Sequence, residues 1–225
     1  MTNKTCILYL HGFASSPRSN KARVFTDRWT REGREAVVPD LNEPDFSSLT
    51  VSRILERTAL EAGKLGRPYV VMGSSLGGYA AALHAQKPDP NLRGVILMAP
   101  AFDFFRRYSQ SIDPATLAGW RERGSMNVMH YDLNREVPLK WDIMADCEKH
   151  AAFPDIADTP CLILHGTRDD VVPPDLSRRF AAVNPGVRLH FLDGGHDLAE
   201  PLPQMLKLVD EFLKEIDQDI DNKGL

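Results

Sequence analysis

The sequence contains little cysteine. Its 225 residues include three cysteines, of which Cys6 and Cys161 stand inside apolar runs while Cys147 lies elsewhere. A disulfide framework needs paired cysteines and is typical of small secreted domains. Buried free thiols in a reducing compartment fit this sequence better, so we expect a cytoplasmic or other reducing intracellular location.

Long hydrophobic runs and an excess of positive charge are also missing. No apolar stretch approaches the roughly 20 residues of a membrane-spanning helix, and residues 1–5 lack the apolar region of a signal peptide. The net charge of -4 gives no basic field that would attract nucleic acid or anionic lipid. We therefore expect a protein with no nucleic-acid partner and no membrane span.

Common motifs for metals and cofactors are absent as well. The sequence has no H-E-x-x-H, no paired C-x-x-C, no G-x-G-x-x-G and no P-loop pattern. We therefore expect no metal and no organic cofactor. No linker rich in Pro, Gly and Ser divides the chain either, which predicts one domain over residues 1–225.

What the sequence does contain is an alternation of short apolar runs with amphipathic segments. The apolar runs predict strands at 6–10, 36–38, 69–72, 94–99, 161–164 and 187–192. The intervening patterns predict helices at about 18–32, 51–62, 76–85 and 174–183, and a closing helix from Met205 to Ile216 with a frayed end after Asp217. This order is typical of an α/β fold with a parallel sheet flanked by helices.

Residues 101–158 interrupt the alternation after the fourth strand. The segment is rich in aromatic residues and methionine, and it is too long for a plain connection. We expect it to form a cap over the carboxyl ends of the strands. Within it, residues 124–141 favour two short strands and residues 141–150 favour a short helix.

The pentapeptide Gly73-Ser74-Ser75-Leu76-Gly77 lies between an expected strand and an expected helix. It matches G-x-S-x-G, in which the middle serine occupies a sharp strand-to-helix turn and projects its hydroxyl from the sheet. Ser75 is therefore the predicted nucleophile. The alternative is a glycine-rich helix start with an incidental serine.

A serine nucleophile needs a base and a carboxylate that orients the base. His196 follows the last expected strand in a Gly-Gly turn, where it can reach the carboxyl edge of the sheet. Asp169 and Asp170 both follow the strand before it, and Asp103, after the fourth strand, is a further alternative. The chain order Ser75, Asp169, His196 matches the Ser, Asp, His order of one known hydrolase architecture.

Negative charge that develops during acyl transfer needs two fixed hydrogen-bond donors, usually backbone N–H groups. The residue after the nucleophile, Leu76, supplies one in this arrangement. The loop after the first strand supplies the other, and here we assign it to Phe13, because Gly12 lets the backbone come close. The alternative for residues 11–13 is an ordinary turn.

Together these motifs resemble the α/β-hydrolase superfamily over nearly the whole chain. The matching motifs are H-G-F at 11–13, G-S-S-L-G at 73–77, H-G-T-R-D-D-V-V-P at 165–173 and G-G-H-D at 194–197. The family pattern H-G-x-x-D-x-x-V-P places the acid at Asp169. Within the superfamily, residues 8–19 and 72–79 resemble the small bacterial YqiA-type esterases. Residues 73–77, residues 165–173 and the aromatic segment at 101–158 also resemble mitochondrial hydrolases of acyl glucuronides and palmitoyl thioesters.

The resemblance implies a minimal core of six parallel strands, because the two strands that open the superfamily fold are missing. It also implies a serine esterase or thioesterase that acts on a small-molecule acyl ester or thioester, with Ser75, Asp169 and His196 as its triad. We expect Phe102, Trp120 and Trp141 to line the acyl site, although packing of the cap onto the core is an equal alternative. A peptidase with the same triad and a non-catalytic binding protein on this scaffold are the competing functions.

Overall fold

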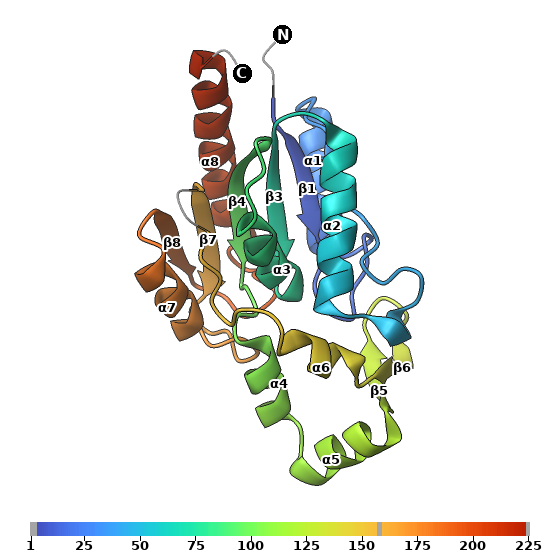
Figure 1. Cartoon of the computed structure of the whole chain (residues 1–225). Coiled ribbons are helices and arrows are strands. Elements are labelled where there is room, and N and C mark those ends of the chain that lie inside the picture. Colours follow the sequence, from blue (N-terminus) through green and yellow to red (C-terminus); the bar gives the residue numbers. More distant parts are fainter. Residues whose placement is uncertain (1–3, 157–158, 224–225) are drawn as a thin grey trace.

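A six-stranded, all-parallel sheet forms the centre of the computed structural model (Figure 1). Its strands are β1 (Cys6–Leu10), β2 (Ala36–Val37), β3 (Tyr69–Ser74), β4 (Leu92–Met98), β7 (Cys161–Gly166) and β8 (Val187–Leu192), in the order β2-β1-β3-β4-β7-β8. This confirms the expected parallel core. The structure describes residues 4–156 and 159–223; residues 1–3, 157–158 and 224–225, which belong to the expected domain and to the end of the expected cap, lie outside the described residues.

In the part of the chain that the structure describes, five helices cover the two faces of this sheet. They are α1 (Asn20–Arg31), α2 (Val51–Leu65), α3 (Leu76–Ala85), α7 (Asp175–Val183) and α8 (Leu202–Lys223). Local signals set several ends: the Ser19 and Thr50 side chains cap the starts of α1 and α2, and Gly66 ends α2 with a φ of 58°. No helix among residues 4–156 and 159–223 is both long and apolar enough to cross a bilayer.

The expected frayed end after Asp217 is wrong, because α8 continues to Lys223. Asp217 forms an ion pair with Arg34 at 2.6 Å and accepts a hydrogen bond from the backbone N–H of Thr5. Ile220, one turn further on, is buried. These contacts anchor the last turns of α8 against the start of β1.

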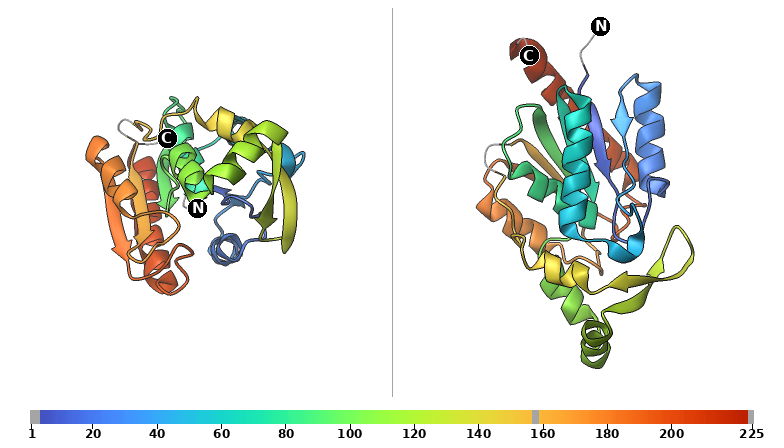
Figure 2. Two further views of the ribbon diagram at one scale, coloured as in Figure 1. Left: turned by 90° about the horizontal axis from the view of Figure 1, so that it is seen from below. Right: turned by 45° about the vertical axis from the view of Figure 1, so that its right-hand side comes forward.

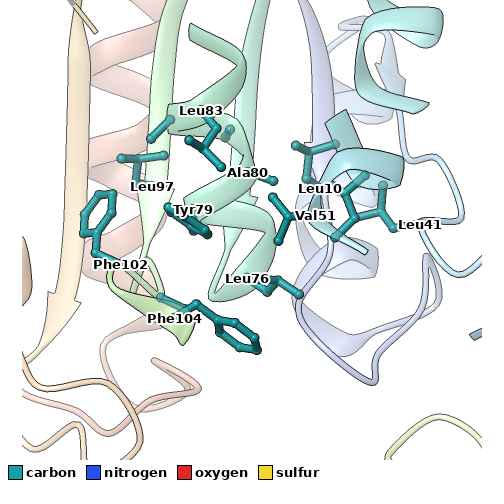
Figure 3. Close-up of a cluster of buried hydrophobic side chains, with 14 of the residues drawn as sticks. Leu10, Leu41, Val51, Leu76, Tyr79, Ala80, Leu83, Leu97, Phe102 and Phe104 are labelled. Atoms are coloured by element: carbon teal, nitrogen blue, oxygen red, sulfur yellow. The ribbon is translucent and has the colours of Figure 1, made fainter. Parts of the chain in front are cut away.

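The strands divide their side chains between two cores, as the period of two along a strand requires. Cys6, Leu8 and Leu10 face the layer that contains α2, α3 and α7. Ile7 and Tyr9 face the opposite layer, which contains α1 and α8. Figure 3 shows part of the first core, where side chains of β1, α2 and α3 meet.

The segment between β4 and β7 contains α4 (Phe104–Ser111), α5 (Pro114–Arg123), β5 (Ser125–His130), β6 (Arg135–Lys140) and α6 (Asp142–Cys147). β5 and β6 pair as an antiparallel hairpin, so the two strands and the short helix expected here are present. Figures 1 and 2 show these elements beyond the carboxyl ends of the parallel strands. Asp146 of α6 joins them to α2, since its carboxylate accepts hydrogen bonds from the backbone N–H and hydroxyl of Ser52 at 2.7 Å each.

Candidate active site

Four strands bring the predicted site residues to one edge of the sheet. Ser75 follows β3, Asp169 follows β7, His196 follows β8 and the loop at residues 11–13 follows β1. In an open α/β sheet, ligands bind beyond the carboxyl ends of the strands, at the point where the strand order reverses. That point lies here at the centre of the order β2-β1-β3-β4, where β1 and β3 are neighbours.

Ser75 occupies the sharp turn that the pentapeptide predicts. Its φ of 54° and ψ of -118° lie in a sparsely populated region for a residue with a side chain. The turn requires glycine on both sides, because a Cβ on Gly73 would lie 2.2 Å from the carbonyl oxygen of Gly77. A Cβ on Gly77 would in turn lie 2.3 Å from the carbonyl oxygen of Leu10.

Ser75, His196 and Asp169 form a continuous chain of hydrogen bonds. Nδ1 of His196 lies 2.8 Å from Oδ2 of Asp169, and Nε2 lies 3.1 Å from Oγ of Ser75. Because a carboxylate only accepts hydrogen bonds, Nδ1 must carry the proton. In the neutral ring Nε2 then carries no proton and can accept that of the Ser75 hydroxyl, as a general base does.

The Asp169 carboxylate is buried and fully bonded. Oδ1 accepts the backbone N–H groups of Val171 and Val172 at 3.0 and 2.7 Å. Burial raises the pKa of this carboxyl, but the hydrogen bonds from His165, His196 and Val172 outweigh it and hold the pKa below its usual range. Asp169 is thus an anion whenever the protein is near neutral pH.

His165 is a second donor to Asp169, a role that the sequence motif at 165–173 did not predict for it. Its Nε2 lies 3.1 Å from Oδ2 of Asp169 and 2.9 Å from the Val172 carbonyl oxygen. Both partners are acceptors, so Nε2 carries the proton and Nδ1 accepts the Ser177 hydroxyl at 2.7 Å. The H-G-x-x-D spacing was the available signal, because it places this histidine four residues before the acid.

The structure separates Asp169 from the alternative acids. Asp103 immediately precedes α4 and accepts a hydrogen bond from Arg106 at 2.7 Å, and Asp170 is exposed. Of the described residues, only Asp169 has a carboxylate hydrogen-bonded to His196.

The expected oxyanion donors lie beside the nucleophile. A Cβ on Gly12 would lie 3.5 Å from Cβ of Ser75, so the loop after β1 packs directly against the turn. Leu76 is the first residue of α3, where backbone N–H groups have no acceptor inside the helix. The ring of Phe13 is held by Phe46 and Tyr108, with centroids 5.7 and 5.6 Å away.

Ser75 and His196 open into a cavity of about 610 Å³. Its wall combines residues after the strands with residues of the segment between β4 and β7. The apolar and aromatic side chains on this wall are those of Tyr9, Phe13, Ala101, Phe104, Tyr108, Val128, Met129, Tyr131, Val171 and Val172. A cavity of this size suits a small organic ligand.

The three aromatic residues selected from the sequence are not on this wall. Phe102 stacks on Phe180 of α7, with centroids 4.3 Å apart, inside the core. Trp120 and Trp141 pack edge to face at 5.1 Å, and both are absent from the cavity lining. Trp120 instead supports Tyr108 from behind, with centroids 6.3 Å apart. Which aromatic side chains line the cavity depends on the direction in which each one points, and amino-acid composition does not contain that information.

The architecture matches several solved structures. Mouse alpha/beta hydrolase domain-containing protein 10 has a TM-score of 0.80 at 19% identity, with 96% of this chain and 92% of that chain covered. Est1E from Butyrivibrio proteoclasticus, solved with ferulic acid, has a TM-score of 0.78 at 19% identity, covering 94% and 88%. A monoacylglycerol lipase from Paleococcus ferrophilus has a TM-score of 0.73 at 16% identity, covering 94% of each. Identities this low establish the fold alone.

A family model extends the comparison to the sequence. The model described as "Uncharacterised protein family (UPF0227)" matches residues 6–213, which include all four motifs of the site. The sequence resemblance and the fold therefore agree. The chain belongs to the UPF0227 family of YqiA-like proteins, and its fold is that of the α/β hydrolases.

Proposed function

We propose that this protein is a serine hydrolase that cleaves carboxylic esters or thioesters through an acyl-enzyme intermediate. One observation supports this above all: the hydrogen-bonded chain of Ser75, His196 and Asp169 opens into an apolar-walled cavity. A serine, a neutral imidazole and a buried carboxylate in this arrangement are what acyl transfer requires.

In the first half of the proposed reaction, Oγ of Ser75 attacks the carbonyl carbon of the ester. Nε2 of His196 takes the hydroxyl proton, and the Asp169 carboxylate stabilises the imidazolium that forms. The oxyanion accepts hydrogen bonds from the backbone N–H groups of Phe13 and Leu76. As the tetrahedral intermediate collapses, the imidazolium gives its proton to the departing alcohol or thiol.

In the second half, water replaces the alcohol or thiol. His196 takes a proton from this water, and the resulting hydroxide attacks the acyl carbon bound to Ser75. Collapse of the second tetrahedral intermediate returns the proton to Oγ and releases the carboxylic acid. The relatives agree with this chemistry in their names: one is a monoacylglycerol lipase, and Est1E was solved with ferulic acid, a carboxylic acid.

Covalent labelling tests the proposal. A fluorophosphonate should react with the purified protein, and mass spectrometry of its peptides should place the adduct on Ser75. In parallel, the protein should hydrolyse 4-nitrophenyl esters. An assay with an acyl thioester then shows whether the protein prefers an alcohol or a thiol as the leaving group. Labelling should fail after denaturation, because Ser75 is reactive only when the folded protein holds His196 beside it.

The contrasting outcomes are clear. A binding protein on this scaffold would give no adduct and no hydrolysis. A peptidase would also give the adduct and would hydrolyse activated esters, so cleavage of peptide amides, which an esterase leaves intact, is what distinguishes it. An adduct on Ser74 would move the nucleophile by one residue.

The cavity wall gives a prediction about acyl chain length. Tyr108 lies on the wall, whereas Trp120 is buried behind it. Tyr108→Ala should therefore lower kcat/KM about tenfold on a long-chain 4-nitrophenyl ester and much less on the acetate, since it removes apolar surface that only a long chain contacts. Trp120→Ala is the matched packing control: it should lower Tm and reduce activity on all chain lengths alike. If Tyr108→Ala, like Trp120→Ala, lowered kcat/KM equally on the long-chain ester and on the acetate, Tyr108 would not contact the acyl chain.

A further inference from the structure

The same cavity contains two cationic side chains that the proposed mechanism does not use. Lys21 of α1 and Arg107 of α4 both line it, together with Ser75 and His196. Both are half-buried, and both are close enough to Asp169 for the carboxylate to act on them electrostatically. Arg107 and Lys21 come from different elements, so the fold brings these charges together.

Lys21 occupies an unfavourable position for a cation. It stands in the first turn of α1, where the helix already presents partial positive charge and where there is no acidic residue. Among the described residues, its ammonium group forms no ion pair and no hydrogen bond. Burial lowers the pKa of Lys21 to about 8, and the Asp197 and Asp169 carboxylates offset this only in part.

Arg107, like Lys21, is a cation without an ion-pair partner among the described residues. Its guanidinium donates a hydrogen bond to the Val171 carbonyl oxygen but forms no ion pair with any residue that the structure describes. Burial lowers the pKa of Arg107 too, despite the nearby carboxylates of Asp169 and Asp103. Its neighbour Arg106, in contrast, is exposed and pairs with Asp103 at 2.6 Å.

The cavity also has two acidic residues, Asp170 and Asp197, but both are exposed. Asp197 accepts the backbone N–H of Ala199, and neither carboxylate forms an ion pair with Lys21 or Arg107. The half-buried charges of the cavity wall are thus positive, and the carboxylates near Lys21 and Arg107 act on them without forming a direct ion pair. An unpaired half-buried cation costs free energy that a bound anion can offset.

We infer that the substrate is an ester or thioester with an anionic group, a carboxylate or a phosphate, which Lys21 and Arg107 bind inside the cavity. This inference rests on the proposed hydrolase function and narrows its substrate class. The anionic group can belong to the acyl part or to the alcohol part of the substrate, and the experiment below distinguishes these two possibilities.

The test uses two pairs of esters that differ in one charge. In the acyl pair, 4-nitrophenyl hydrogen adipate is compared with 4-nitrophenyl hexanoate. In the alcohol pair, 3-carboxyphenyl butyrate is compared with 3-carbamoylphenyl butyrate. For each pair the quantity measured is the ratio of kcat/KM for the anionic ester to that for the neutral ester, in the wild type and in Lys21→Met, Arg107→Gln and the double variant.

We expect the wild type to favour the anionic ester of at least one pair, and the double variant to lower that ratio about ten- to hundredfold, the size of an interaction with a charged group. Arg23→Gln and Arg106→Gln are the matched controls, since each removes an exposed cation from the same helix, and both should keep the wild-type ratio. A double variant that keeps the wild-type ratio for both pairs overturns the inference.

The proposed function is judged separately in the same assay. Hydrolysis of the neutral esters that disappears in Ser75→Ala supports the hydrolase function whatever the ratios are. If the ratios do not change while this hydrolysis depends on Ser75, only the anionic substrate class is wrong. If no ester is hydrolysed, or if hydrolysis survives in Ser75→Ala, both proposals fail together.

Discussion

Ser75→Ala should abolish ester hydrolysis, with kcat reduced by at least about a thousandfold. The variant removes the one atom that forms the covalent intermediate. The backbone of the turn, which Gly73 and Gly77 make possible, is left in place. Steady-state kinetics with a 4-nitrophenyl ester measures the loss, and thermal unfolding shows whether the protein still folds.

Folding should be retained, because the substitution deletes one hydrogen bond, from Oγ to His196, and adds no volume. Ser74→Ala is the informative comparison. Ser74 is the buried last residue of β3 and also lines the cavity, but its hydroxyl forms no hydrogen bond with His196 among the described residues. It should lose far less activity. If Ser74→Ala were the inactive variant and Ser75→Ala the active one, the nucleophile would be assigned wrongly.

Much of this architecture follows from the sequence, because the relevant signals are local. A short, continuous apolar run such as residues 6–10, soon followed by glycine, favours a strand covered on both faces. G-x-S-x-G needs glycine for a steric reason that holds in any fold of this type. The strand order brings Ser75, Asp169 and His196 together once the sheet is parallel. The sequence alone therefore predicts Ser75, Asp169 and His196 as one site.

The segment between β4 and β7 shows the opposite case. Its two strands and its short helix have local signals, but the direction of each side chain depends on contacts distant in sequence. Phe102 and Phe104 are two residues apart, yet the first stacks in the core on Phe180 while the second lines the cavity. Hydrophobicity alone could not distinguish them.

The sequence was equally unable to predict which charged side chains face the cavity. Lys21 lies in a stretch rich in arginine and lysine, which the sequence alone makes typical of a solvated helix face. Only the tertiary structure shows that this lysine faces the cavity while Arg23 faces solvent. Similarly, His165 has a role beyond its turn because α7 brings Ser177 within 2.7 Å of its ring.

His196→Ala should reduce kcat about as much as Ser75→Ala, by at least about a thousandfold, although Ser75 itself is untouched. Without the imidazole, the hydroxyl has no base within hydrogen-bond distance, since Nε2 of His196 is its acceptor. Asp169→Asn should be less severe, because the imidazole remains but loses the carboxylate that selects its tautomer. The three variants are compared by single-turnover kinetics.

The decisive arm is the double variant Ser75→Ala with His196→Ala. Residues of one relay act as a unit, so the double variant should be no slower than either single variant, whereas independent contributions would multiply the losses. Because the His196 side chain is 22% exposed, its removal opens a path from solvent to Ser75, and added imidazole should restore part of the activity of His196→Ala but none of that of Ser75→Ala. Multiplying losses, or rescue of both variants alike, would show that His196 does not act through Ser75.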